Sequence, residues 1–162
     1  GSNGSVVPHF IDQIRRFNKV TVTDDTMTRY FLTLPEAIEL LFQAAQFSVG
    51  GETYVMNMPS FYIIDLARVI IKHYGNKDTK IETIGLREGE KIHELLISEH
   101  ESKNTYKYNQ DYYAILPELK INRNYNHINI DDKVDFKTFS SADNIKDSDY
   151  LFNMLMKGDF LV

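Results

Sequence analysis

Stretches in which apolar residues recur at helical spacing alternate with short stretches that favour extended structure. This alternation constrains the fold of the chain more than any other feature. Apolar residues recur at helical spacing over 6–17, after Thr33 and over 63–74, as in helices with one apolar face. Between them, runs rich in β-branched and aromatic residues predict short strands at 20–23, 28–33, 54–56 and 80–84. The sequence therefore predicts an α/β chain, folded as a small mixed α+β domain.

The helix after Thr33 has the clearest start signal. Thr33 and Glu36 have the spacing of a capping box, in which each side chain bonds the backbone N–H of the other residue. Pro35 suits the first turn, where a missing N–H costs nothing. One apolar face is predicted for this helix, formed by Ile38, Leu41, Phe42 and Ala45.

The pattern weakens in the second part of the chain. We expect a short helix over 91–97, and beyond Ser98 only 112–116 resembles a strand. A brief apolar helix is expected near the C-terminus, over 149–157. These features predict a binding domain over 1–97 and a C-terminal extension over 98–162. The extension is expected to be partly irregular and docked on the domain or on a partner subunit.

Composition excludes several classes of protein. The 162 residues are 43% hydrophobic, enough for one compact domain with a sizeable core. The net charge of −5 argues against nucleic acid or an anionic membrane as a partner. There is no cysteine, and no apolar run approaches the roughly 20 residues of a membrane span. A cytoplasmic setting is the default expectation, and a small molecule is the expected ligand.

Motifs for cofactor or metal chemistry are missing from the sequence. No Gly-x-Gly-x-x-Gly occurs among the eight glycines, and no tyrosine is followed by lysine in a Tyr-x-x-x-Lys pair. The five histidines have no spacing typical of metal ligands. The chain therefore lacks a complete redox site, and no metal site and no catalytic residue is predicted within it.

Two arginines suggest where an anion binds. Arg87 lies in a stretch with two glycines, 85–91, just before the expected helix start, and a helix N-terminus attracts phosphate. Arg29 lies in an apolar and aromatic run, where an unpaired buried charge would be costly. Taken singly, Arg87 also fits a surface loop arginine paired with Glu88 or Glu90. Arg29 also fits a residue at a strand edge with its charge in water. Together they suggest a diphosphate ligand, with Glu90 placed to accept hydrogen bonds from sugar hydroxyls.

Several ordered motifs resemble one family. They cover the chain up to about residue 96, and weaker likeness continues at 112–117 and 139–144. The chain is similar to the C-terminal, substrate-binding part of extended short-chain dehydrogenases/reductases. Within them it resembles the polysaccharide-biosynthesis (CapD-like) branch, typified by inverting UDP-N-acetylglucosamine 4,6-dehydratases. The motifs that carry the resemblance are 4–8, 20–24, 27–31, 34–37, 64–68 and 85–91.

The resemblance implies a role for particular residues. Arg29 and Arg87 would bind the diphosphate of a UDP-sugar, and Glu90 would lie near the ribose hydroxyls. Four further residues would border the uracil, largely through backbone groups: Val6, Pro8, Thr21 and Thr23. One departure is Glu88, where members of the family commonly have proline.

The resemblance also implies partners outside the chain. NAD(P) and the acid/base residues would belong to a preceding N-terminal Rossmann domain, which this chain does not contain, and the full-length protein would be a homo-oligomer. The family reaction is a 4,6-dehydration that makes precursors of capsule, other surface polysaccharide or glycan. By itself the chain should be inactive, a UDP-sugar-binding half of an NAD- or NADP-dependent lyase.

Two alternatives stay open. A UDP-sugar 4-epimerase of the same superfamily would share the UDP-binding motifs and differ in the domain that is absent. A non-catalytic module that holds subunits together would share only the fold. Residues 1–5 fit either an added cloning sequence or the end of a glycine-rich loop.

Overall fold

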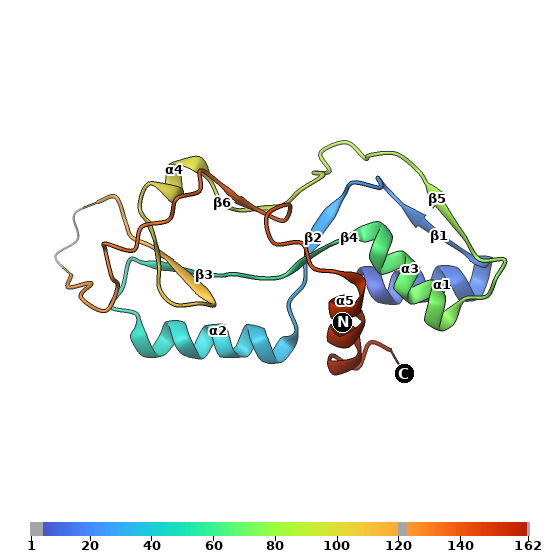
Figure 1. Cartoon of the computed structure of the whole chain (residues 1–162), viewed down its shortest axis with the longest axis horizontal. Coiled ribbons are helices and arrows are strands. Elements are labelled where there is room, and N and C mark those ends of the chain that lie inside the picture. Colours follow the sequence, from blue (N-terminus) through green and yellow to red (C-terminus); the bar gives the residue numbers. More distant parts are fainter. Residues whose placement is uncertain (1–4, 120–122, 162) are drawn as a thin grey trace. The chain divides into compact units, whose positions relative to one another are not determined.

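A computed structural model describes residues 5–119 and 123–161 of the chain (Figure 1). By their internal contacts these residues group into two compact units. The first contains the described parts of Gly1–Tyr30, Ser60–Glu94 and Ile145–Val162, and the second contains those of Phe31–Pro59 and Leu95–Asn144. The mixed α and β architecture confirms the predicted fold class. The division into domains after residue 97 stays a prediction.

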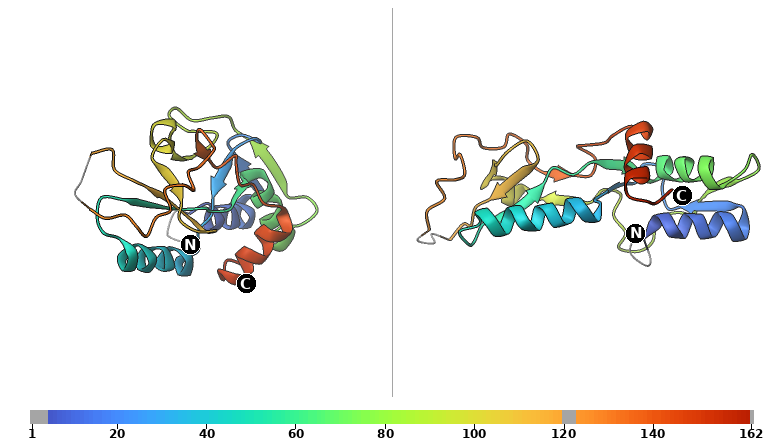
Figure 2. Two further views of the ribbon diagram at one scale, coloured as in Figure 1. Left: turned by 60° about the vertical axis from the view of Figure 1, so that its left-hand side comes forward. Right: turned by 90° about the horizontal axis from the view of Figure 1, so that it is seen from below.

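Three helices supply most of the core of the first unit. Helix α1 (Val6–Phe17) packs on α3 (Ile63–Tyr74), which also contacts α5 (Ser148–Lys157), as the views in Figures 1 and 2 show. The predictions of these three helices are confirmed. Their apolar positions at helical spacing are the buried ones, as expected for helices that pack one face on a core. The buried residues of these helices include Val7, Phe10, Ile14, Leu66, Ala67, Ile70, Leu151, Met154 and Leu155.

Two pairs of short strands complete the first unit. Strand β1 (Lys19–Val22) pairs in parallel with β5 (Lys80–Thr83), and β2 (Thr28–Tyr30) pairs antiparallel with β4 (Ser60–Tyr62). In β1 alternate residues are buried, as expected for a strand with one face on the core. The irregular segment after β5, residues 84–94, belongs to this unit and carries Arg87 and Glu90.

The second unit is built on a three-stranded sheet. Its strand order is β3 (Thr53–Met56), β8 (Tyr112–Ile115) and β7 (Thr105–Lys107), all antiparallel. Strand β6 (Leu95–Ile97) pairs separately with β9 (Phe139–Ser140). Directly after β6, α4 (Glu99–Ser102) forms a single capped turn. The C-terminal part is therefore more ordered than the sequence predicts, since β7, β9 and α4 were not expected.

Helix α2 (Leu34–Phe47) has the predicted start and an exposed apolar face. Both bonds of the capping box join Thr33 and Glu36. The helix contacts β3, yet none of its residues is buried. Several large apolar side chains of the helix are exposed: Leu34, Ile38, Leu41, Phe42 and Phe47. Contiguous exposed apolar surface of this kind is unusual in a protein that works alone.

The predicted helix over 91–97 is wrong. Residues 91–94 form an irregular segment and residues 95–97 form β6. In a helix the carbonyls of Lys91 and Ile92 would accept bonds from amides four residues further on. Here both carbonyls accept bonds from the Arg29 guanidinium instead, so no helical turn forms at this place. Among all the described residues, no helix combines the length and the apolar character needed to cross a bilayer.

Candidate functional site

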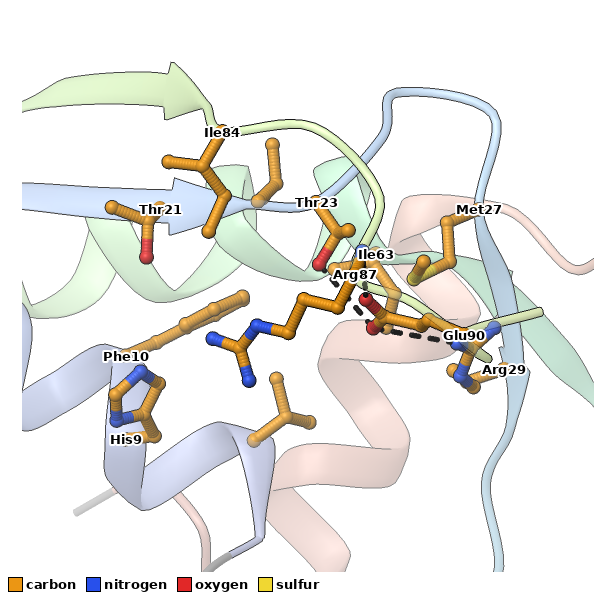
Figure 3. Close-up of a pocket in the computed structure, with 12 residues that line it drawn as sticks. His9, Phe10, Thr21, Thr23, Met27, Arg29, Ile63, Ile84, Arg87 and Glu90 are labelled. Atoms are coloured by element: carbon orange, nitrogen blue, oxygen red, sulfur yellow. Dashed lines mark hydrogen bonds and ion pairs between the residues drawn. The ribbon is translucent and has the colours of Figure 1, made fainter. Parts of the chain in front are cut away.

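A cavity of about 460 Å³ lies within the first unit (Figure 3). Its volume is in the range of small-molecule sites. Six of the seven residues that the sequence pointed to line it: Val6, Thr21, Thr23, Arg29, Arg87 and Glu90. The seventh, Pro8, is exposed in the first turn of α1 and is not among the lining residues.

Separate elements bring these residues together. Val6 begins α1, Thr21 and Thr23 lie on and just after β1, and Arg29 belongs to β2. Arg87 and Glu90 come from the irregular segment after β5. Phe10 and Met27 add apolar surface, and both are buried. The cavity is thus lined by both charged and apolar side chains, as suits a site for an organic anion.

Arg29 is held mainly by neighbouring backbone. Its Nη1 atom donates to the carbonyls of Thr28 (2.7 Å) and Ile92 (3.1 Å), and its Nη2 atom donates to the carbonyl of Lys91 (2.8 Å). Glu90 and Glu94 lie 3.9 and 3.5 Å from its guanidinium, and the side chain is 23% exposed. The ligand contact expected of this arginine stays a prediction, and its bonds to the segment after β5 were not expected from the sequence.

Arg87 differs from Arg29 in having an unpaired guanidinium. Figure 3 shows its side chain reaching into the cavity toward Phe10 and His9. Within residues 5–119 and 123–161, no hydrogen bond or ion pair involves this guanidinium. An arginine whose charge points into a cavity without a protein partner is well placed to bind a phosphate or carboxylate.

Glu90 connects three parts of the site. Its carboxylate accepts hydrogen bonds from the Thr23 hydroxyl (3.4 Å) and the Arg87 backbone N–H (3.3 Å), and it lies 3.9 Å from Arg29. The backbone between Arg87 and Glu90 closes a turn with a 3.0 Å bond. Gly89 in that turn has φ of 78°, which side chains with a Cβ seldom adopt.

The strand predicted to border the uracil has an unforeseen partner. Gln13 of α1 accepts the Thr21 backbone N–H at 3.0 Å and donates to the Thr21 hydroxyl at 2.7 Å. The backbone N–H and the hydroxyl of Thr21 therefore both have a partner inside the protein. Nothing in the sequence identified Gln13, because a residue on a helix finds its partner on a strand only after the two have packed.

The helix end at the cavity is the N-terminus of α1. The helix expected after residue 90 does not form, so the predicted phosphate site at its N-terminus is wrong. Val6, the first residue of α1, lines the cavity instead, and the Ser5 side chain makes no capping bond. Unpaired N–H groups and the helix dipole make such an end attractive to an anion.

Comparison with known proteins decides the family. Residues 1–116 match the family described as polysaccharide biosynthesis protein. The chain belongs to this family. The match confirms the resemblance found in the motifs, and it covers the elements that build the cavity.

Three relatives give the family its context. The Staphylococcus aureus capsular polysaccharide biosynthesis protein CapD is 46% identical over 62% of this chain and 17% of its own length. A Campylobacter jejuni UDP-N-acetylglucosamine 4,6-dehydratase (inverting) is 36% identical over 75% of this chain and 35% of its own. A Rickettsia canadensis UDP-glucose 4-epimerase is 35% identical over 70% of this chain and 33% of its own.

A solved structure is similar over nearly the whole chain. The X-ray structure of Pen from Bacillus thuringiensis matches with a TM-score of 0.84 at 32% identity, over 98% of this chain and 47% of that one. The chain therefore spans between about a sixth and about a half of the proteins it is compared with. The relatives of this family member include dehydratases and epimerases.

The described residues offer no cradle for a dinucleotide. Such a cradle needs a glycine-rich turn between a strand and a helix. Glycines with positive φ occur at 50, 51, 85 and 89, and each lies in a segment that leads into a strand or irregular chain. Within the same residues, no group of three or more His, Cys, Asp or Glu is placed to hold a metal ion.

Proposed function

We propose that this chain is the UDP-sugar-binding portion of a nucleotide-sugar 4,6-dehydratase. The substrate would be UDP-N-acetylglucosamine, and the product a precursor of surface polysaccharide or glycan. One observation carries the proposal: candidate binding residues from four segments of the chain meet in one cavity, and the unpaired Arg87 guanidinium points into it. The name of the Campylobacter relative supports the reaction and the substrate class, and the name of the Staphylococcus relative supports the surface polysaccharide.

The charges around the cavity suggest how a diphosphate would be held. Arg87 would grip phosphate oxygens, helped by the N-terminal N–H groups of α1. Arg29 would add positive charge from β2 while keeping its bonds to the backbone. Glu90, already hydrogen-bonded to Thr23, would accept bonds from the ribose hydroxyls. The uracil would lie against α1 and β1, near Val6 and Thr23.

The contribution of this chain to the reaction would be positioning. NAD(P) would supply hydride transfer when bound to an N-terminal Rossmann domain, which would also carry the acid/base residues. The residues of this chain would fix the sugar nucleotide in one orientation, which lowers the barrier by removing rotational and translational freedom beforehand. By itself the chain should bind nucleotide and not turn it over.

Titration with UDP tests the binding site. We expect the wild-type chain to bind UDP saturably, and Arg87→Ala to weaken binding roughly 10- to 100-fold, since one charge-assisted contact is lost. Arg16→Ala is the matched control, because Arg16 is an exposed α1 residue paired with Asp12 outside the cavity. Equal affinity of all three proteins would remove the diphosphate assignment.

A UDP-sugar 4-epimerase is the second candidate, favoured by the Rickettsia relative. The two candidates differ in their products and agree on the UDP site. NMR of the sugar made by the full-length protein would distinguish a 4-keto-6-deoxy sugar from a C4 epimer. A chain that showed no saturable UDP signal and self-associated would instead fit a non-catalytic interaction module.

A further inference from the structure

The segment that carries Arg87 and Glu90 has no secondary structure of its own. Residues 84–94 contain neither helix nor strand. Gly85 and Gly89 have φ of 84° and 78°, and open space surrounds the position of an added Cβ at each. The conformation of this segment therefore depends on its bonds to the rest of the first unit.

The first half of the segment is anchored near β1. The Ile84 backbone N–H donates to the Val22 carbonyl at 2.9 Å, which continues the pairing of β5 with β1. The Glu90 carboxylate then holds the turn through its bonds to Arg87 and Thr23. These contacts fix where the segment starts and how it turns.

The second half is anchored to β2. The Ile92 carbonyl accepts the Thr28 backbone N–H at 3.0 Å and the Arg29 guanidinium at 3.1 Å. The His93 ring adds a side-chain bond, because its Nδ1 atom lies 2.8 Å from the Thr28 hydroxyl oxygen. Thr28 is 0% exposed, so this bond is sheltered from water on the threonine side.

We propose that His93 is a positioning residue for the nucleotide site. His93 does not line the cavity, so it acts through the segment it anchors. Its bond to Thr28 holds the end of the segment on β2, and the turn that presents Arg87 and Glu90 is thereby kept at the cavity. The inference rests on the proposed function, in which the ligand bound by Arg87 is a nucleoside diphosphate.

Substitutions at residue 93 test whether the bond from His93 to Thr28 is what supports the nucleotide site. His93→Ala removes the bond to Thr28. His93→Asn places an amide group about where the ring Nδ1 was, so it can restore the bond. His100→Ala is the matched control, because His100 is an exposed histidine on α4, paired with Glu118 in the second unit.

The test is UDP titration of these variants of the whole chain, followed by amide hydrogen exchange. We expect His93→Ala to weaken UDP binding about tenfold, which is the scale of one lost hydrogen bond, and His93→Asn to recover most of it. His93→Ala should also speed exchange of the Thr28 amide, and should add little to Arg87→Ala, because both act through one group.

Different results would overturn different claims. Wild-type UDP affinity in His93→Ala, additive losses in the double variant, or unchanged exchange of the Thr28 amide would each overturn the role of His93. If the wild-type chain bound no UDP, the proposed function would fail. The exchange rate of Thr28 would then still decide whether His93 anchors the segment.

Discussion

Helices α2 and α3 are both amphipathic by sequence, yet only α3 is covered. In α3 the apolar face is buried, and Leu66 is 0% exposed. In α2 no residue is buried, and Leu41 is 69% exposed. Apolar periodicity therefore predicts that a helix forms and which face is apolar, but it does not predict whether the chain itself supplies the surface that covers that face.

The N-termini of α1 and α2 differ in a similar way. Thr33 and Glu36 satisfy the first N–H groups of α2 with their own side chains. At α1 the Ser5 side chain makes no capping bond, and the helix starts at the cavity. A helix end capped by its own residues has little to offer a ligand, whereas an uncapped end keeps its donors available.

The largest expected effect compares two leucines. Leu66→Ala should lower the free energy of unfolding by about 2–5 kcal/mol, because it leaves a cavity in the core. Leu41→Ala should change it by less than about 0.5 kcal/mol, because that side chain is mostly in water. Urea unfolding of both variants, followed by circular dichroism, measures the difference. If Leu41→Ala cost as much as Leu66→Ala, the face of α2 would be covered in solution and the comparison would fail.

The comparison of helix ends predicts a smaller effect. Thr33→Ala should lower the free energy of unfolding by about 1 kcal/mol, since it removes both bonds of the Thr33 hydroxyl, to the Glu36 carboxylate and from the Glu36 backbone N–H. Ser5→Ala should change it by less than about 0.5 kcal/mol, because no capping bond is lost. The same urea experiment applies. A larger cost at Ser5 than at Thr33 would mean that α1 is capped after all.

The smallest expected effect is the shifted ionisation of Tyr54, which reports how tightly the second unit packs. Burial raises the pKa of Tyr54 to about 12 from 10.0, and the charges of Tyr108 and Glu52 add to this. The pKa of Tyr54 is higher in the folded chain than in the unfolded chain. Its contribution to the free energy of unfolding is therefore complete below pH 10.0 and is lost as the pH rises to about 12. Burial also raises the pKa values of Tyr108, Tyr112 and Tyr113, so ultraviolet titration should show several late-ionising tyrosines, one of which Tyr54→Phe removes. Ionisation of Tyr54 near pH 10.0 would indicate that the unit is loosely packed around its sheet.

Local signals predicted much of the fold. The spacing of Phe10 and Ile14 predicted α1, and Thr33 with Glu36 predicted the start of α2, because helix formation and capping depend on residues a few positions apart. The segment after residue 90 was predicted wrongly because its carbonyls bond Arg29, some sixty positions earlier. A bond between residues so far apart leaves no trace in a local pattern.

The candidate site was predictable in its members and not in their partners. Arg29 and Arg87 were identified from their surroundings in the sequence, and both line the cavity. The bonds that distinguish them appear only in three dimensions, as do Gln13 on Thr21 and His93 on Thr28.

Mapping UDP on the chain by NMR tests the central claim most directly. The account predicts saturable shifts of backbone amides around the cavity, including Val6, Thr23 and Arg87, and weaker binding in Arg87→Ala. No saturable shift, or shifts confined to the second unit, would contradict it.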